Sequence, residues 1–270
     1  MQREPLKSVF LDGDGVLWRA DNAINGLHRL FQVLEQHAID WALLTNNNTR
    51  TRDDYVQKLR GFGISTNPEQ VFTSSTVTAD YLKERFGPEA RFHVIGMGGL
   101  IDTLRDAGFV LSIGEERSEN EVAAVVAGMD REITHEKIKV AMRLILDGAA
   151  FIATNTDGSF PTPDGFNPGT GMVIGALQAT SNVQPVVIGK PEAAIFEMAL
   201  AKLGADPAST AMVGDRLETD ILGANRAGLF SIAVLTGVTN RQQIATSQIQ
   251  PDLVYDDIRA LAQALEDGEL

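Results

Sequence analysis

Short apolar runs alternate with amphipathic segments along most of this chain. The runs have the length of strands and lie at 8–11, 41–45, 92–95, 122–128, 150–154, 186–188 and 210–213. Between them, apolar residues recur at helical spacing, as at Leu27, Leu30, Phe31 and Leu34. Continuous apolar strands separated by helices are typical of a mostly parallel sheet covered by helices on both faces. The alternation therefore predicts an α/β fold.

A break at Gly87-Pro88 divides this pattern. A helix expected over about 76–86 ends there, and a second series of strands and helices begins with the run 92–95. The series ends with a helix rich in small residues over about 170–181. We therefore expect a core domain built from 1–87 and 185–270, with an α/β domain inserted at 88–184.

Composition excludes several classes of function. The 270 residues carry a formal net charge of -13 and no basic block, which disfavours nucleic acid as a partner. The absence of cysteine excludes disulfides, thiolate ligands and thiol nucleophiles. No apolar run approaches the ~20 residues of a membrane span, and acidic residues come too early for a secretory signal. We expect a cytoplasmic protein with no membrane partner.

The stretch FLDGDGVLW, residues 10–18, ends the first strand with two carboxylates one residue apart. In an extended segment Asp12 and Asp14 project from the same face, where like charges repel unless a cation lies between them. Three interpretations stay open on this stretch alone. It is a surface turn, a metal site or an acid/base pair.

Other strand ends carry complementary polar groups. They are Thr45 with Asn46, Lys190, and Asp215 with Asp220. Parallel strands deliver the residues at their carboxyl ends into one crevice, where ligands bind. Carboxylates, a hydroxyl, a carboxamide and one cation together suit Mg²⁺ and a phosphate group, because Mg²⁺ prefers oxygen ligands and shares them with substrate phosphates.

Four ordered motifs carry a resemblance to a known family. They are DGDGVL at 12–17, TNN at 45–47, GKP at 189–191 and GDRLETD at 214–220. Together they resemble the motifs of haloacid dehalogenase (HAD) superfamily phosphatases. The insertion between the second and third motifs resembles the cap of subfamily IIA, the NagD-like, p-nitrophenyl phosphatase and phosphoglycolate phosphatase type. The resemblance implies a HAD-like Rossmannoid core with an inserted α/β cap of the C2 type.

The resemblance also implies roles for individual residues. Asp12 is the nucleophile that forms an aspartyl-phosphate, and Asp14 is the general acid and base. Mg²⁺ is bound by Asp12, by the backbone carbonyl of Asp14 and by Asp215. The residues that hold the phosphate group are Thr45, Asn46, Asn47 and Lys190. Asp220 orients Lys190 or a metal-bound water.

Substrate choice is expected to come from the cap. Asn155 and Asp157 lie in a long irregular stretch, which is either a plain loop or the segment that selects the substrate. The family implies a small phosphorylated metabolite, such as phosphoglycolate, a sugar phosphate, a nucleotide or pyridoxal phosphate, and members often form homodimers through their caps. Gly13 and Asn48 depart from the family pattern, which more often has an apolar residue and a serine or threonine at these positions.

Alternative interpretations rest on weaker signals. GMGG at 96–99 lacks the third glycine of a dinucleotide-binding GxGxxG, so a tight turn is favoured. The four histidines are scattered without the spacing of metal ligands. A response-regulator receiver module also gathers acids, a threonine and a lysine around a phosphorylated aspartate, but it needs no large insertion. A phosphomutase on the same fold is a further alternative.

Overall fold

The computed structural model describes residues 5–116, 121–162 and 165–270. These residues form two compact units, named here unit 1 and unit 2. Unit 1 comprises the described residues of Met1–Thr45, Tyr55–Phe72 and Lys190–Leu270, and unit 2 those of Asn46–Asp54 and Thr73–Gly189. Within the described part of the chain, no helix combines the length and the apolar character needed to cross a membrane.

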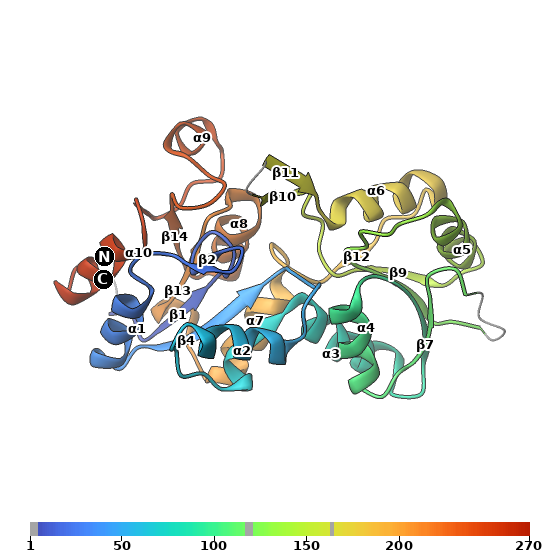
Figure 1. Ribbon diagram of the computed structural model, residues 1–270, viewed down its shortest axis with the longest axis horizontal. Coiled ribbons are helices and arrows are strands. Elements are labelled where there is room, and N and C mark those ends of the chain that lie inside the picture. The colour runs from blue at the N-terminus through green and yellow to red at the C-terminus, as the bar shows by residue number, and fades with distance from the viewer. Residues whose placement is uncertain (1–4, 117–120, 163–164) are drawn as a thin grey trace. The chain divides into compact units, whose positions relative to one another are not determined.

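Unit 1 is built on a six-stranded sheet with the order β15-β14-β13-β1-β4-β5 (Figure 1). The pairs β1–β4, β1–β13, β13–β14 and β14–β15 are parallel. Its elements are β1 (Ser8–Leu11), β2 (Trp18–Arg19), β3 (Asn22–Ala23), α1 (Leu27–Gln36), β4 (Asp40–Thr45), α2 (Arg52–Gly61), η1 (Pro68–Gln70), β5 (Val71–Thr73), α7 (Ala193–Leu203), η2 (Pro207–Ser209), β13 (Thr210–Gly214), η3 (Leu217–Ile221), α8 (Leu222–Ala227), β14 (Phe230–Val234), α9 (Arg241–Thr246), β15 (Leu253–Tyr255) and α10 (Ile258–Glu266). α2 and β5 each cross a boundary between the units.

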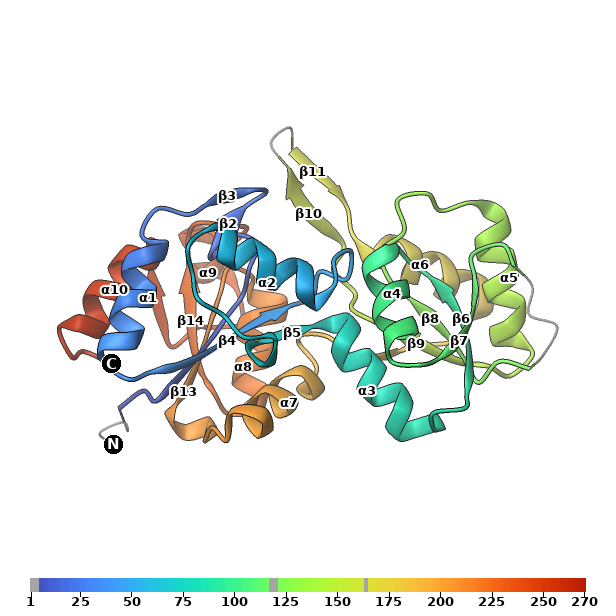
Figure 2. The same cartoon turned by 60° about the horizontal axis from the view of Figure 1, so that its bottom comes forward.

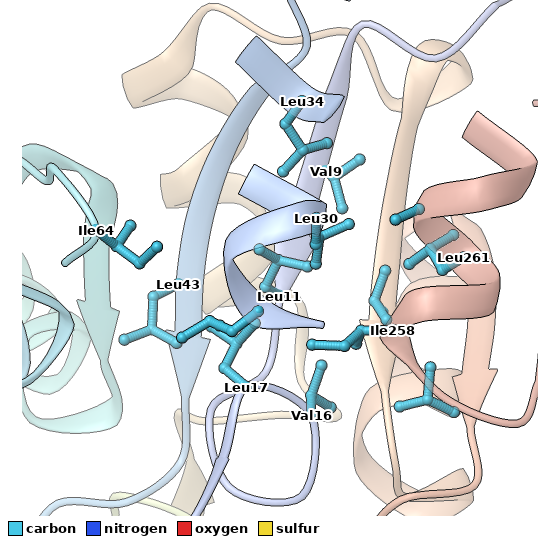
Figure 3. Close-up of a cluster of buried hydrophobic side chains, with 14 of the residues drawn as sticks. Val9, Leu11, Val16, Leu17, Leu30, Leu34, Leu43, Ile64, Ile258 and Leu261 are labelled. Carbon is cyan, nitrogen blue, oxygen red and sulfur yellow. The ribbon is translucent and has the colours of Figure 1, made fainter. Parts of the chain in front are cut away.

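Helices cover both faces of this sheet because its strands are mostly apolar and buried. On one face, Val9 and Leu11 of β1 pack against Leu30 of α1 and Leu261 of α10, as Figure 3 shows. On the other face, α7 packs against β4, and α8 packs against β14. Burying one leucine side chain contributes about 2 kcal/mol. Because this core buries many apolar side chains, it is the main source of the stability of unit 1.

Unit 2 has its own five-stranded sheet, with the order β12-β9-β8-β6-β7 (Figure 2). All four of its strand pairs are parallel. The elements are α3 (Ser74–Phe86), β6 (Arg91–Ile95), α4 (Gly98–Asp106), β7 (Val110–Ile113), β8 (Ala124–Ala127), α5 (His135–Leu146), β9 (Ala150–Ala153), β10 (Ser159–Thr162), β11 (Gly165–Pro168), α6 (Thr170–Ser181) and β12 (Val186–Val187). β10 and β11 form an antiparallel hairpin within the stretch expected to be irregular.

The alternating side chains of β6 assign helices to the two faces of this second sheet. Phe92 makes an edge-to-face contact with Phe86 of α3, with ring centroids 5.8 Å apart. Ile95 points to the opposite face and packs in the cluster that contains Ala141 of α5 and Leu177 of α6. Unit 2 is therefore a second layered α/β body with its own core.

The junctions between the units differ from the expected ones. We expected the inserted domain to span 88–184, but unit 2 begins at Thr73 and ends at Gly189, and it also takes residues 46–54. α3 belongs to unit 2 because it packs against α4 and β6 rather than closing unit 1. β12, expected as the first strand of the resumed core, pairs with β9 of unit 2. The sequence of a helix does not indicate which sheet the helix packs against, and the sequence of a two-residue strand does not indicate which sheet the strand extends.

Candidate active site

Neighbouring parallel strands of unit 1 bring the first polar residues to one edge of the sheet. β1 lies between β4 and β13, with Leu11 level with Leu43 and Val213. Asp12 directly follows β1, and its backbone N–H donates to the carbonyl of Val213 at 2.9 Å. Thr45 is the buried last residue of β4. The expected convergence of these strand ends is present within unit 1.

Lys190 is a buried cation at this edge, with only 2% of its surface exposed. Its Nζ lies 2.6 Å from Oδ1 of Asp12 and 2.7 Å from Oδ1 of Asp220, and it donates to the carbonyl of Leu44 at 2.8 Å. Three acceptors match the three donors of an ammonium group. Burial alone would lower the pKa of Lys190, but the carboxylates of Asp12 and Asp220 outweigh it and raise that pKa above its ordinary value. Lys190 is therefore charged at neutral pH.

Asp215 follows β13 and is fixed by the backbone around it. Its Oδ2 accepts a hydrogen bond of 2.7 Å from the N–H of Val238. A Cβ added to Gly15 would lie 2.5 Å from the same oxygen, and one added to Gly237 would lie closer still. Only glycine leaves room for the carboxylate at these two positions, so the loops around Asp215 are shaped to hold it.

Asp220 is presented by η3, a single π-helical turn. The N–H of Ile221 bonds to the carbonyl of Arg216, five residues earlier, at 3.2 Å. The side chain of Asp220 is 1% exposed, and its Oδ2 accepts from the N–H of Arg216 at 3.1 Å. Such turns are rare and often mark functional sites, because the extra residue re-aims a side chain. Here the turn aims Asp220 at Lys190.

Three of these carboxylates form a cluster that suits a divalent metal ion. One oxygen from each of Asp12, Asp215 and Asp220 lies within 4.8 Å of the others. In their ionised forms the three carboxylates outnumber the single ammonium of Lys190 that pairs with them. Oxygen donors and an excess of negative charge fit Mg²⁺. Asp12 and Asp215, two of the predicted metal residues, are thus brought together, with Asp220 as the third carboxylate of the cluster.

The pKa values of the cluster reflect its charge imbalance. Burial raises the pKa of Asp12 well above its ordinary value, and Asp220 and Asp215 raise it further, while Lys190 opposes the change. Burial, followed by the charge of Asp220, raises the pKa of Asp215 to about 7. A nearby cation would favour the ionised forms.

Asp14 lies apart from the three clustered carboxylates and has a different partner. Its Oδ1 accepts a hydrogen bond of 3.0 Å from Nε1 of Trp18, which is fully buried. The two residues also form a backbone bridge. The Asp14 side chain is thus held by the loop that follows β1.

Unit 2 contains a separate polar network centred on Asn48, which is 1% exposed. Its Nδ2 donates to Oγ1 of Thr154 at 2.9 Å, to Oδ1 of Asn155 at 2.9 Å and to Oγ1 of Thr170 at 3.3 Å. Its Oδ1 accepts from the N–H of Met129 at 2.9 Å. One side chain therefore joins the 46–54 segment to the ends of β8 and β9 and to the start of α6.

The candidate substrate residues of unit 2 belong to the same network. Nδ2 of Asn46 donates to Oδ2 of Asp157 at 2.8 Å, and Nδ2 of Asn155 donates to the same oxygen. The side-chain oxygen of Asn47 instead accepts from the N–H and the hydroxyl of Thr49, at 3.1 and 2.7 Å, and shapes the turn. Asn46, Asn155 and Asp157 are thus brought together, whereas Asn47 points its oxygen into its own loop.

Comparison with known proteins gives matches over almost the whole chain. The profile of the haloacid dehalogenase-like hydrolases matches residues 9–110, and a HAD-hydrolase-like profile matches residues 187–261. An acid sugar phosphatase of Staphylococcus aureus is 35% identical over 96% of this chain and 98% of its own length.

Solved structures agree as well. A 4-nitrophenylphosphatase of Thermotoga maritima is 32% identical, with a TM-score of 0.89 over 96% of this chain and 97% of that one. NagD of Escherichia coli K-12 is 30% identical, with a TM-score of 0.83 over 95% of this chain and 98% of that one.

The chain belongs to the haloacid dehalogenase-like hydrolase family.

Within this family the chain is a phosphatase of the NagD-like and p-nitrophenyl phosphatase type, and the expected α/β fold is confirmed. Three groups of this HAD hydrolase make contacts that the sequence does not indicate. In unit 1 they are the indole of Trp18, which bonds to Asp14, and the carbonyl of Leu44, which accepts from Lys190. In unit 2 it is Asn48, which differs from the usual residue of the family pattern.

Two discarded motifs have structural explanations in this HAD fold. In GMGG, a Cβ on Gly99 would lie 2.6 Å from the backbone carbon of Arg50, so this glycine allows close packing of α4 on the 46–54 segment. His93 is buried in β6, where its Nδ1 lies 3.0 Å from the hydroxyl of Ser112. Neither feature points to a ligand.

Proposed function

We propose that this HAD phosphatase hydrolyses small-molecule phosphate monoesters through an aspartyl-phosphate on Asp12, with Mg²⁺ as cofactor. The observation that carries the proposal is the ion pair of 2.6 Å between Asp12 and the buried Lys190, beside the carboxylates of Asp215 and Asp220. A nucleophilic carboxylate needs positive charge close by that offsets the incoming phosphate, and Lys190 supplies one such charge.

The proposed reaction has two displacements. A carboxylate oxygen of Asp12 forms a bond to phosphorus while the bond from phosphorus to the alkoxy oxygen breaks, and Asp14 gives a proton to that leaving oxygen. Water then attacks the phosphorus of the aspartyl-phosphate and gives a proton to Asp14. Inorganic phosphate leaves and the carboxylate of Asp12 is restored. Splitting one difficult displacement into two easier ones is the advantage of such a covalent intermediate.

Other residues bind and orient the phosphoryl group in this proposal. Thr45, Asn46 and Lys190 supply hydrogen-bond donors for its oxygens, where negative charge must be stabilised. Asp220 keeps Lys190 charged and in place through its 2.7 Å ion pair. Asp12, Asp215 and the backbone carbonyl of Asp14 would hold Mg²⁺, with Asp220 close by. When bound, the ion supplies positive charge that offsets the carboxylates and the phosphate.

For the substrate, we propose a phosphorylated sugar or a similar polar metabolite. The Staphylococcus aureus relative named acid sugar phosphatase supports this class. Asn155 and Asp157 are the proposed selecting residues, because Asp157 is half-buried and two amides fix one of its oxygens. A fixed carboxylate is a hydrogen-bond acceptor suited to sugar hydroxyls.

The test is phosphate release over a panel of sugar phosphates, nucleotides, phosphoglycolate and pyridoxal phosphate, with p-nitrophenyl phosphate as a general substrate. We expect many phosphates released per chain with Mg²⁺ and none after chelation. Calorimetry should detect Mg²⁺ binding to the substrate-free protein, weakened in Asp215→Asn.

A matched pair of variants checks the nucleophile. Asp12→Asn should abolish turnover, whereas Asp40→Asn, at the exposed start of β4, should retain it. Near-normal turnover by the Asp12 variant, or a single phosphorylation per chain without further release, would contradict the proposal.

A further inference from the structure

Trp18 is a fully buried indole whose only polar atom points at Asp14. Its exposure is 0%, and its Nε1 donates to Oδ1 of Asp14 at 3.0 Å. Both residues lie in unit 1. An indole N–H is a donor only, so this bond forms whether the carboxyl group is ionised or protonated on its other oxygen.

The loop between Asp12 and Trp18 is closed by its own backbone. The carbonyl of Gly13 accepts from the N–H of Leu17 at 2.9 Å and from that of Trp18 at 3.1 Å, and the N–H of Gly15 donates to the carbonyl of Trp18 at 2.8 Å. These bonds bring Trp18 back to the start of the loop. Its position relative to Asp14 is therefore set by local geometry.

Trp18 also explains why residue 13 is glycine. A Cβ at position 13 would lie 2.9 Å from Cη2 of the indole and closer still to Cζ2. The ring thus occupies the space that an apolar side chain would need. Gly13 departs from the family pattern because the indole of Trp18 lies where a larger side chain would have to be.

Unit 1 holds the indole from its other sides. Tyr55 stacks on it with ring centroids 6.0 Å apart, and Phe62 packs against it at 6.2 Å. Nζ of Lys58 lies 4.4 Å from the ring centroid and donates to the carbonyl of Ala20 at 2.6 Å. A cation over the ring is attracted to its π-electrons. The closed loop, Tyr55 and Lys58 therefore hold the indole in place even where the contact with Phe62 is loosened.

We propose that Trp18 is a positioning residue that holds Asp14 in the orientation for protonating the leaving oxygen. The inference rests on the proposed function, in which Asp14 is the general acid. With Oδ1 fixed by the indole, Oδ2 is the oxygen that carries the proton. When the bond from phosphorus to the leaving oxygen breaks, the proton moves from Oδ2 to that oxygen, and Asp14 becomes a carboxylate.

This role makes a distinctive prediction about leaving groups. An alkoxide leaves poorly unless it is protonated, whereas p-nitrophenolate is a stable anion and needs little help from an acid. Misplacing Asp14 should therefore slow the release of an alcohol much more than the release of p-nitrophenol. The ratio of kcat/KM for an alkyl phosphate to kcat/KM for p-nitrophenyl phosphate measures this effect, because kcat/KM includes the step in which the leaving group departs.

The test compares Trp18→Phe, which keeps an aromatic ring but loses the N–H, with Phe62→Leu, which loosens the packing of the indole but keeps its hydrogen bond. We expect Trp18→Phe to lower the ratio about tenfold, and Phe62→Leu to leave it within about twofold of the wild-type value. Asp14→Asn, if it retains measurable activity, should lower the same ratio at least as much. If Trp18→Phe does not fold, benzothienylalanine at position 18 removes the N–H with little change of shape.

An unchanged ratio in Trp18→Phe or in the benzothienylalanine protein overturns the inference, even if both rates fall together. An equal fall in the ratio in Phe62→Leu also overturns it, because packing alone would then account for the effect. Neither result touches the proposed function, which is contradicted by near-normal turnover in Asp12→Asn, or by a wild-type protein that shows no phosphate release beyond a single phosphorylation per chain.

Discussion

The replacement Asn48→Ala should strongly destabilise unit 2. The change removes a buried side chain whose amide joins the 46–54 segment to Thr154, Asn155, Thr170 and Met129. Alanine offers no donor or acceptor to any of these groups. Because the site is 1% exposed, water cannot readily replace the lost contacts.

The size of this loss of stability can be estimated from each hydrogen bond that Asn48 makes. The N–H of Met129 loses its side-chain acceptor in a buried position, which costs about 1–3 kcal/mol. The two donor bonds of 2.9 Å contribute about 1 kcal/mol each. The longer contact to Thr170, at 3.3 Å, adds little. We expect a loss of about 3–5 kcal/mol in the free energy of unfolding, a large part of the typical stability of a domain.

Urea unfolding followed by circular dichroism measures this loss. With a slope of about 2–3 kcal/mol per molar urea, the midpoint should fall by about 1–2.5 M. Asn167→Ala is the control, because Asn167 is exposed on β11 of the same unit, and its midpoint should stay near that of the wild type. Both tryptophans lie in unit 1, so their fluorescence reports that unit separately. Midpoints of the two variants within about 0.3 M of each other would refute the reasoning.

Three further perturbations test other parts of the molecule. Gly13→Ala should cost about 1–3 kcal/mol of stability, because the added Cβ clashes with the indole ring of Trp18. Gly175→Ala is the control and should cost nothing, because its added Cβ meets no atom within 4 Å. Thermal unfolding compares the two variants. Lys190→Met should lower kcat at least about 100-fold in a phosphate-release assay, because it removes the cation beside the proposed nucleophile, Asp12. A tenfold or smaller loss would contradict the role proposed for Lys190. Burial lowers the pKa of His93 from 6.5 to about 4, so the unfolded chain binds the extra proton and stability should fall by about 3 kcal/mol as the pH drops through this range. Urea titrations of His93→Gln should lack that part of the decline, whereas exposed His135→Gln should keep it.

Much of the candidate active site in unit 1 could be predicted because it follows from strand direction. Asp12, Thr45 and Asp215 come directly after or at the end of apolar runs, and a parallel sheet brings such ends together whatever the order of its strands. The layers of helices and strands could be predicted for a different reason. Apolar residues recur with one period in helices and another in strands, and both periods can be seen in the sequence.

What could not be predicted depends on contacts between distant parts of the chain. The residues that accept hydrogen bonds from Nδ2 of Asn48 are 106 to 122 positions away in the sequence. A single polar residue in a loop does not indicate which distant residues it will contact. From the sequence, Trp18 is simply a large apolar residue suited to a core. Its hydrogen bond to Asp14 depends on the direction of its indole N–H, which the sequence does not give. The junctions near 73 and 189 depend on which sheet accepts a short element, and pairing of that kind is decided by tertiary packing.

The split of unit 2 between residues 46–54 and 73–189 limits how this unit can be exchanged between homologues. A chimaera that exchanges only the long segment with a homologue would leave Asn46 and Asn48 from one parent facing a loop from the other. The donor asparagines and their acceptors would then come from sequences that had never evolved together. Recombination designs for this phosphatase should therefore move the short stretch after Thr45 along with the larger block, as a single two-part cassette.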